Sequence, residues 1–296
     1  MNVDTPGRQL LFSTVRITNV LTSGVATSGT GFLLFVDLED GRHAPLLLTN
    51  KHVVANSARL ITHFIQRGET ADEPNLGVGF DVELDPGNWF GHPEPSVDVA
   101  VVPMAPVFAS VGPKLFTRAL PLSLLATEVE GLYLDAIEEI TFVGYPDGRY
   151  DTKHLTPIVR RGVTATPLDL DLNGQPTFLV DGSVFGGSSG SPVFLFNEGA
   201  YRGPHGLHIG TRMVLVGIIA QTWVRPGVHP VEVAAQEHVK IAKELNLGVA
   251  FNARAIKETV DAVITAAGVR TKAPHAGTRV AIDPATDTLT PPTSEG

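Results

Sequence analysis

Three short segments carry side chains that together could perform nucleophilic chemistry. His52 follows an apolar stretch in "LLLTNKHVVANS", Asp98 opens the apolar stretch "DVAVV", and Ser189 lies in "GGSSGSPV". A serine hydroxyl becomes a nucleophile when an imidazole accepts its proton, and a carboxylate can orient that imidazole. Taken singly, each residue has an ordinary explanation as a surface histidine, a turn aspartate or a Gly/Ser turn. Their joint occurrence favours a site for attack on an acyl group.

The elements that must position these residues are mostly strands. Short apolar runs separated by Gly, Pro, Asp and Asn predict two groups of six strands up to about residue 252. Many short strands with few helices indicate barrels or sandwiches, and two groups of six favour two barrels. His52 and Asp98 belong to the first group, and Ser189 belongs to the second. The predicted strands are 10–20, 29–38, 44–50, 58–65, 77–84, 98–104, 139–146, 156–166, 176–182, 191–196, 213–223 and 247–253.

Helical spacing is confined to the last third of the chain. Asn252 can cap a helix whose apolar residues share one face, and a second helix is expected over residues 229–246. The predicted domains are an N-terminal barrel over 1–115, a C-terminal barrel with its helix over 116–268, and a flexible tail over 269–296 rich in Pro, Thr and Ala. The residues expected on the buried face of the first helix are Ile256, Val260, Val263 and Ile264.

Composition narrows the class of protein. Of the 296 residues, 43% are apolar and 18% charged, which allows a large core and excludes global disorder. The net charge of −9 argues against nucleic acid or an anionic membrane surface as the main partner. The chain has no cysteine, which excludes disulfides and thiolate catalysis. With neither a secretory signal nor a membrane span in the sequence, a cytoplasmic protein is expected.

Ten histidines invite a search for a metal site. His205 and His208 are three residues apart but have no neighbouring carboxylate. Asp81, Glu83 and Asp85 alternate along one run, which is typical of a half-exposed strand and makes calcium the minor alternative. We therefore expect neither a metal nor another cofactor.

The motifs "GTGFLL", "TNKHVV", "DVAVV", "VGYPDG", "GGSSGSPV" and "VGIIAQT" together resemble a known family. Over roughly residues 10–265 the chain is similar to the chymotrypsin-like (trypsin-fold) serine peptidases, and in texture to bacterial trypsin-like and DegP/HtrA-type protease domains. The order His, Asp, Ser is that family's order. The resemblance implies an all-β fold of two six-stranded antiparallel barrels with a C-terminal helix. It also implies a serine endopeptidase acting through an acyl-enzyme.

The resemblance assigns roles to individual residues. His52 would be the general base, Asp98 its orienting carboxylate and Ser189 the nucleophile, since glycines at 187 and 190 flank Ser189 in the family's arrangement but do not flank Ser188 or Ser191 in that way. The backbone N–H groups of Gly187 and Ser189 would form the oxyanion hole.

The resemblance also suggests a substrate-binding wall. Ser183 would lie at the base of the specificity pocket, Ala220 where the substrate backbone pairs, and Thr222 where a side chain narrows the pocket. A small or medium apolar residue is then expected before the scissile bond. The alternative is that Ser183 and Thr222 are ordinary strand residues in a differently built pocket.

The chain departs from the family in two places. Ser188 stands where the digestive branch has an aspartate that pairs with a newly cleaved N-terminus, so no switch of that kind is expected. The segment after residue 265 is too short for the PDZ module of DegP/HtrA proteins.

Three functions remain open on the sequence. The first is an endopeptidase with a peptide or protein substrate. The second is a restrained peptidase-fold binding module, or one activated by a protein partner in a bacterial multi-protein system. The third is an esterase that uses the same three residues.

Overall fold

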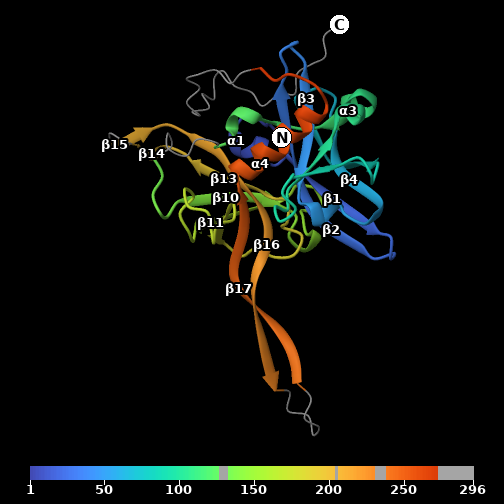
Figure 1. Cartoon of the computed structure of the whole chain (residues 1–296). Coiled ribbons are helices and arrows are strands. Elements are labelled where there is room, and N and C mark those ends of the chain that lie inside the picture. The colour runs from blue at the N-terminus through green and yellow to red at the C-terminus, as the bar shows by residue number, and fades with distance from the viewer. Residues whose placement is uncertain (127–132, 204–205, 231–237, 273–296) are drawn as a thin grey trace.

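The structure, a computed structural model, describes residues 1–126, 133–203, 206–230 and 238–272, with the backbone alone for 223–230 and 238–245. Within these ranges the chain is mostly β, and Figure 1 shows two β-rich halves with a helix, α4, lying across them. No helix in the described part of the chain is long and apolar enough to cross a membrane.

The elements of the N-terminal half are mainly strands with short helical turns between them. They are α1 (Pro6–Leu10), β1 (Thr14–Leu21), β2 (Ala26–Asp37), β3 (His43–Thr49), α2 (Lys51–Val54), β4 (Ser57–Arg67), β5 (Pro74–Leu84), β6 (Phe90–Gly91), β7 (Ala100–Pro103), α3 (Ala105–Val111), η1 (Gly112–Lys114), β8 (Leu115–Phe116), β9 (Leu120–Pro121) and η2 (Leu122–Leu124).

The C-terminal half contains the longest strands and the longest helix. Its elements are β10 (Glu139–Gly144), η4 (Pro146–Gly148), β11 (Ile158–Thr164), β12 (Thr177–Asp181), β13 (Pro192–Asn197), β14 (Ala200–Gly203), β15 (Gly206–Ile209), β16 (Arg212–Pro230), β17 (His238–Asn252) and α4 (Ala253–Ala266).

The six strands predicted for the N-terminal half all form. They lie in a nine-stranded sheet of order β5-β4-β1-β2-β3-β7-β6, with β8 paired to β4 and β9 paired to β2. The three additional strands, β6, β8 and β9, are two residues long, which is too short for a periodic sequence signal. Because β8 pairs with β4 and β9 pairs with β2, this sheet includes residues up to Pro121.

The C-terminal half is a closed antiparallel barrel of order β10-β11-β12-β17-β16-β13. The all-β fold class is therefore confirmed, with a closed six-stranded barrel and a C-terminal helix. In the N-terminal half, where the sequence predicted a second six-stranded barrel, the predicted strands belong to the nine-stranded sheet. All six runs predicted for this half are strands, and β13, which follows the Ser189 loop directly, has its first four residues buried.

The helix expected over 229–246 is wrong for every residue of that segment that the structure describes. β16 continues to Pro230 and β17 begins at His238, and the two pair from Val224↔Glu244 to Pro230↔His238. Figure 1 shows this hairpin extending away from the rest of the molecule. Where β16 extends beyond the barrel, its backbone N–H and C=O groups pair with those of the returning segment. This strand pairing overrides the local preference for a helix. Residues 231–237 lie outside the described residues.

The helix predicted after Asn252 is confirmed as α4. The Asn252 side-chain oxygen accepts a hydrogen bond from the backbone N–H of Ala255 at 3.2 Å, so the predicted cap forms. The four residues predicted for its apolar face are buried. The helix packs against β16 and β17 of the barrel and against β6 and β7 of the other half. It therefore spans the junction between the halves.

The flexible tail predicted over 269–296 is wrong for its first four residues, 269–272, which are ordered against the N-terminal half. The backbone N–H of Lys272 donates to the carbonyl of Asp37, and that of Glu39 donates to the carbonyl of Arg270. Residues 269–272 are therefore joined to the end of β2, because the unpaired backbone there offers partners. Residues 273–296 lie outside the described residues.

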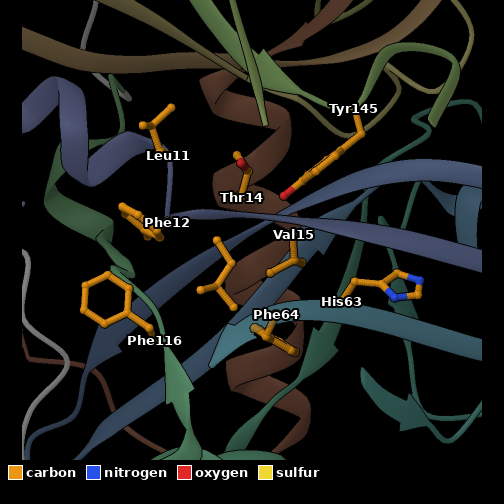
Figure 2. Close-up of a pocket in the computed structure, with 9 residues that line it drawn as sticks. Leu11, Phe12, Thr14, Val15, His63, Phe64, Phe116 and Tyr145 are labelled. Atoms are coloured by element: carbon orange, nitrogen blue, oxygen red, sulfur yellow. The ribbon is translucent and has the colours of Figure 1, made fainter. Parts of the chain in front are cut away.

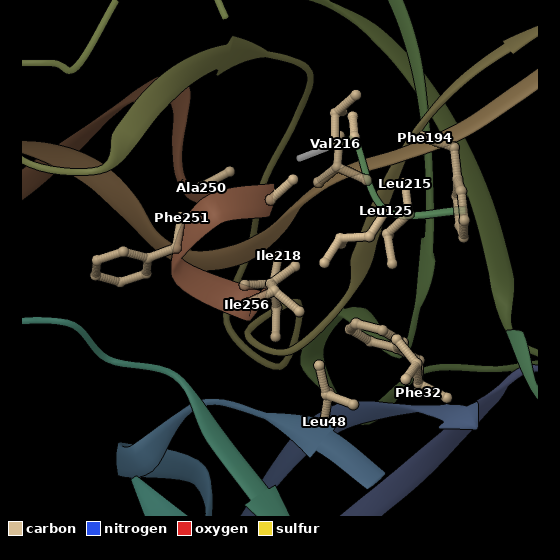
Figure 3. Close-up of a cluster of buried hydrophobic side chains, with 14 of the residues drawn as sticks. Phe32, Leu48, Leu125, Phe194, Leu215, Val216, Ile218, Ala250, Phe251 and Ile256 are labelled. Atoms are coloured by element: carbon tan, nitrogen blue, oxygen red, sulfur yellow. The ribbon is translucent and has the colours of Figure 1, made fainter. Parts of the chain in front are cut away.

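The two halves share one apolar core. Phe32 and Leu48, from β2 and β3, belong to the same buried cluster as Phe194 and Ile218 of the barrel. Figure 3 shows Phe32 and Leu48 on the N-terminal strands, facing the barrel side chains. A second cluster, which includes Leu47 and Val54, fills the N-terminal half. Packing across the junction fixes how the segment carrying His52 meets the segment carrying Ser189.

Candidate active site

His52 and Asp98 meet because β3 and β7 are neighbours. The antiparallel register pairs Thr49, the last residue of β3, with Ala100, the first residue of β7. His52 follows the end of β3 and Asp98 precedes the start of β7, so both residues lie beyond the same end of this strand pair. Their neighbourhood follows from strand order and register.

The Asp98 carboxylate holds His52 through two contacts. Nδ1 of His52 lies 2.5 Å from Oδ2 of Asp98, and the backbone N–H of His52 donates to Oδ1 at 3.1 Å. An ionised carboxylate can only accept hydrogen bonds, so the contact assigns the proton to Nδ1 in the neutral ring. Nε2 is then left as a proton acceptor.

Two neighbours of His52 brace the segment that carries Asp98. The side-chain amide of Asn50 donates to the carbonyl of Asp98 at 2.6 Å. The ammonium of Lys51 donates to the carbonyl of Glu94 at 3.1 Å, and burial lowers the pKa of Lys51. Asn50, Lys51 and His52 thus all contact the segment 94–98. The sequence alone singled out only His52.

The same segment is joined to α4 through His92. Nε2 of the buried His92 lies 3.0 Å from Oε2 of Glu258, and Nδ1 accepts the backbone N–H of Glu94 at 2.9 Å. Since Nδ1 accepts, the proton lies on Nε2, which donates to the carboxylate. His92 is therefore a structural link between the helix and the segment that carries Asp98.

The Ser189 loop has a conformation that requires glycine at two positions. Gly187 and Gly190 have φ of +76° and +88°, which disfavours residues with a side chain. A Cβ at residue 187 would lie 2.6 Å from the carbonyl oxygen of Tyr145, and one at residue 190 would lie 1.8 Å from that of Thr30. The glycines of "GGSSGSPV" thus serve backbone conformation and close approach to neighbouring segments.

The loop is tied to the N-terminal half by its backbone. The N–H of Thr30 donates to the carbonyl of Ser189 at 2.9 Å, and the Thr30 hydroxyl donates to the carbonyl of Gly187 at 2.9 Å. The hydroxyl of Thr49, three residues before His52, donates in turn to the carbonyl of Thr30 at 2.7 Å. Thr30 therefore connects the Ser189 loop to the end of the strand that precedes His52.

The Ser189 hydroxyl does not bond His52 in this structure. Its Oγ donates to the backbone carbonyl of Ala220 at 2.8 Å. Ala220 lies at an irregularity in the β16–β17 pairing, between Ile219 and Gln221, where its carbonyl is free to face the loop. The structure thus brings His52 and Asp98 into contact and gives the Ser189 hydroxyl a different partner.

The two backbone N–H groups expected to form an oxyanion hole, those of Gly187 and Ser189, make no hydrogen bond to any residue that the structure describes. Of the neighbouring N–H groups, that of Ser188 donates to the carbonyl of Phe185 and that of Gly190 donates to the carbonyl of Ile219. Free donors on either side of one residue are what an incoming carbonyl oxygen needs.

The residues expected to form the pocket wall are joined by hydrogen bonds. The Thr222 hydroxyl donates to the carbonyl of Val184 at 3.0 Å and so connects two segments expected to face each other across the substrate. Val184 itself is buried in the shared core. Ser183 is exposed, and its carbonyl accepts a hydrogen bond from Nη1 of Arg160. Arg160 escaped the sequence analysis because neighbouring Arg161 and the alternation of β11 make it resemble a surface strand residue.

Neither of two cavities in the structure is lined by His52, Asp98 or Ser189. The one in Figure 2, about 10 Å³ in volume, lies among Phe12, Phe64, Phe116 and Tyr145 and is about the size of a water molecule. The other, about 160 Å³, adjoins it beside Arg16, His63 and Tyr150. The described residues contain no group of three His, Cys, Asp or Glu that could hold a metal ion.

A family profile described as "Trypsin-like peptidase domain" matches residues 29–203, more than half of the chain. The comparison with curated proteins finds no match.

Three solved structures illustrate the range of similarity. The active form of the Rv3671c protease from M. tuberculosis is 18% identical, with a TM-score of 0.44 and coverage of 93% of this chain and 88% of that one. The HtrA-type protease AlgW, with a tripeptide, is 13% identical, with a TM-score of 0.47 and coverage of 86% and 61%. The thermostable serine protease AL20 from an extremophilic microorganism is 14% identical, with a TM-score of 0.46 and coverage of 86% and 98%.

Proposed function

Since the chain belongs to the trypsin-like peptidase family, we propose that it is a serine endopeptidase that uses Ser189, His52 and Asp98. The observation that carries the proposal is the contact between Nδ1 of His52 and Oδ2 of Asp98 at 2.5 Å, together with the backbone N–H of His52 on the same carboxylate. That pair of contacts orients the ring and leaves Nε2 to accept a proton.

The proposed reaction begins with a rotation of the Ser189 hydroxyl. In the described conformation Oγ donates to the carbonyl of Ala220, so a change of the χ1 rotamer must bring it to Nε2 of His52. Oγ then attacks the substrate carbonyl carbon, its proton passes to Nε2, and the negative oxygen accepts hydrogen bonds from the N–H groups of Gly187 and Ser189. His52 returns the proton to the leaving amine, and water hydrolyses the acyl-enzyme by the same route.

We place a small or medium apolar residue before the scissile bond. The hydrogen bond from the Thr222 hydroxyl to the carbonyl of Val184 at 3.0 Å supports this, because it draws the two walls together. Ser183 carries no charge to bind a basic side chain, and the edge at Ala220 is where a substrate backbone would pair. The substrate is a peptide or protein. The chain's lack of cysteine fits our proposal that it acts in the cytoplasm.

One observation favours a second candidate, a peptidase that a protein partner must activate. The Ser189 hydroxyl bonds the carbonyl of Ala220 and not His52, so the resting arrangement differs from the reactive one proposed above. A partner that displaces this hydrogen bond, or that orders the substrate edge beside it, would shift the population toward the reactive rotamer.

A labelling and hydrolysis experiment separates the candidates. Wild type, Ser189→Ala and the exposed-turn control Ser23→Ala are treated with a fluorophosphonate probe and assayed on a peptide library. We expect wild type and Ser23→Ala to be labelled and to cleave after small apolar residues, and Ser189→Ala to lose labelling and about 10³-fold or more in kcat/KM.

The remaining outcomes are equally informative. Labelling without cleavage favours the partner-activated protein, and the absence of both in wild type favours a binding module. Equal labelling of wild type and Ser189→Ala rejects Ser189 as the nucleophile. Cleavage of small esters without any peptide cleavage rejects the peptidase in favour of an esterase.

A further inference from the structure

Arg160 reaches the Ser189 loop from β11. Its Nη2 donates to the hydroxyl of Ser188 at 2.7 Å, and its Nη1 donates to the carbonyl of Ser183. The backbone N–H of Phe185 also donates to the Ser188 hydroxyl, at 3.3 Å. One guanidinium therefore joins both ends of the segment 183–188, which forms the expected pocket wall and leads into Ser189.

The surroundings of this guanidinium make its position costly. It lies over the ring of Phe142 at 4.6 Å and near the ring of Phe185 at 5.9 Å, while its Nε is buried without a hydrogen-bond partner among the described residues. It forms no ion pair with any carboxylate in the described part of the chain. Burial lowers the pKa of Arg160 to about 10, which Asp147 partly opposes. Removing a charge from water is costly unless hydrogen bonds compensate it. Here the compensating partners are the Ser188 hydroxyl and the Ser183 carbonyl, both in the segment 183–188.

Ser188 is the residue that connects the Arg160 guanidinium to the backbone around Ser189. It is fully buried, and its peptide groups connect Gly187 to Ser189, the two residues whose N–H groups are free. A hydrogen bond from a charged donor is stronger than one between neutral groups. Fixing the Ser188 side chain therefore fixes the orientation of the N–H groups on either side of it.

We infer that Arg160 is a positioning residue that holds the segment 183–188 so that the N–H groups of Gly187 and Ser189 face an oxyanion. This inference rests on the proposed function of Ser189. In this arrangement the positive charge that contacts residue 188 comes from the Arg160 side chain on β11. An alternative for the same side chain is recognition of an acidic residue before the scissile bond, because Arg160 also contacts Ser183.

The test compares Arg160→Gln with a matched neighbour, Arg161→Gln. Arg161 is on the same strand, its side chain is 69% exposed, and its nearest carboxylate oxygen, on Glu139, is 3.9 Å away. Two readouts are measured for both variants and wild type. The first is kcat and KM on peptides that differ only in Ala or Glu before the scissile bond. The second is amide hydrogen exchange across residues 183–191, which needs no activity.

A positioning role predicts a specific pattern. In Arg160→Gln, kcat falls on the order of 10- to 100-fold on whichever of the two peptides wild type cleaves, with KM nearly unchanged, because the oxyanion donors are misplaced while the binding edge remains. Exchange at Ser188 and Gly190 rises about tenfold or more, and that of β13 stays as in wild type. Arg161→Gln matches wild type in both readouts. Ser188→Ala, which removes the acceptor and keeps the cation, shows the same changes to a smaller extent.

Other outcomes overturn the inference. If the loss is confined to the Glu peptide, Arg160 binds substrate and does not position the loop. If exchange across 183–191 is unchanged in Arg160→Gln, the guanidinium does not hold the segment. If exchange rises but wild type cleaves nothing, the anchoring of the loop stands and the proposed peptidase function fails.

Arg160→Lys tests whether the charge is the holding element. The charged groups facing this site are Asp147 on η4 and the guanidinium itself, while Ser183, Ser188, Phe142 and Phe185 are neutral. Lysine has a lower ordinary pKa than arginine and meets the same burial. The protonated form holds the loop, so kcat is lost as pH rises through the pKa. We expect this alkaline loss at a lower pH in Arg160→Lys than in wild type, and identical profiles would contradict the role of the charge.

Discussion

At the scale of single residues, the site depends on which partner each polar atom finds. Asp98 uses both carboxylate oxygens on His52, one for the ring and one for the backbone N–H, so it sets the position of the ring as well as its tautomer. Ser189 shares its hydroxyl hydrogen with Ala220, and its reactivity therefore depends on a rotamer change. In the proposed reaction His52 is therefore oriented in advance, whereas the Ser189 hydroxyl must first leave the carbonyl of Ala220.

The substitution Asp98→Asn tests the preset base. The two contacts both need an acceptor, and an amide has only one acceptor oxygen. If that oxygen stays on the backbone N–H of His52, the N–H₂ faces Nδ1, and the proton of the neutral ring moves to Nε2. We expect kcat to fall by about 10⁴-fold while the melting temperature changes little. Steady-state kinetics and thermal unfolding are measured together. A variant with wild-type kcat would remove Asp98 from the proposed triad.

At the scale of elements, strand ends and helix caps bring the polar residues together. β3 and β7 end and begin at the same level, so the segments after and before them place His52 beside Asp98. α4 packs across both halves and binds the segment that carries Asp98 through Glu258 and His92. The stability of α4 is therefore coupled to the site as well as to the barrel.

The substitution Asn252→Ala tests how much the cap at the start of α4 contributes to stability. The Asn252 side chain satisfies the backbone N–H of Ala255, and removing this cap should lower the free energy of unfolding by about 1 kcal/mol. Thr265→Ala, at an exposed position near the end of the same helix, is the control and should cause no loss. Urea unfolding followed by circular dichroism measures both. Equal stability of Asn252→Ala and wild type would show that the cap contributes nothing.

At the scale of the whole molecule, one apolar cluster joins the two halves. Phe32 and Leu48 of the N-terminal half pack with Phe194 and Ile218 of the barrel (Figure 3), and backbone hydrogen bonds from Thr30 cross the same junction. With such a junction we expect the halves to unfold together, because neither keeps its core when the other is lost. The relative position of His52 and Ser189 is a property of this junction.

The substitution Phe32→Ala tests the shared core. Phe32 is fully buried, and its truncation should lower the free energy of unfolding by about 3–5 kcal/mol while calorimetry still shows a single transition. Phe90→Ala, at a side chain that is 42% exposed, should have a much smaller effect. Two separate transitions in wild type or Phe32→Ala would mean that the halves are independent domains.

Much of the fold was predictable because strand and cap signals are local. The twelve apolar runs and the Asn252 cap depend on neighbouring residues, and each predicted run contributes to a strand in the structure. The strand conformation of residues 238–246 was not predictable. The composition of this segment favours a helix, and its backbone partner is the remote strand β16. Arg160 was missed for the same reason, because its importance comes from Ser188 and Ser183, which are remote in sequence.

The amino-acid order alone determined which residues could do chemistry and in which half each lies, because glycines at 187 and 190, the polar residues at strand ends and the strand periodicity are written locally. The tertiary structure decided which of them meet. The register of β3 and β7 brought His52 into contact with Asp98. Packing across the shared core placed Thr30 against the Ser189 loop. The irregularity at Ala220 left a carbonyl that accepts the hydrogen bond of the Ser189 hydroxyl. Contacts of this kind depend on distances between segments far apart in the chain, and those distances exist only once the two halves have packed.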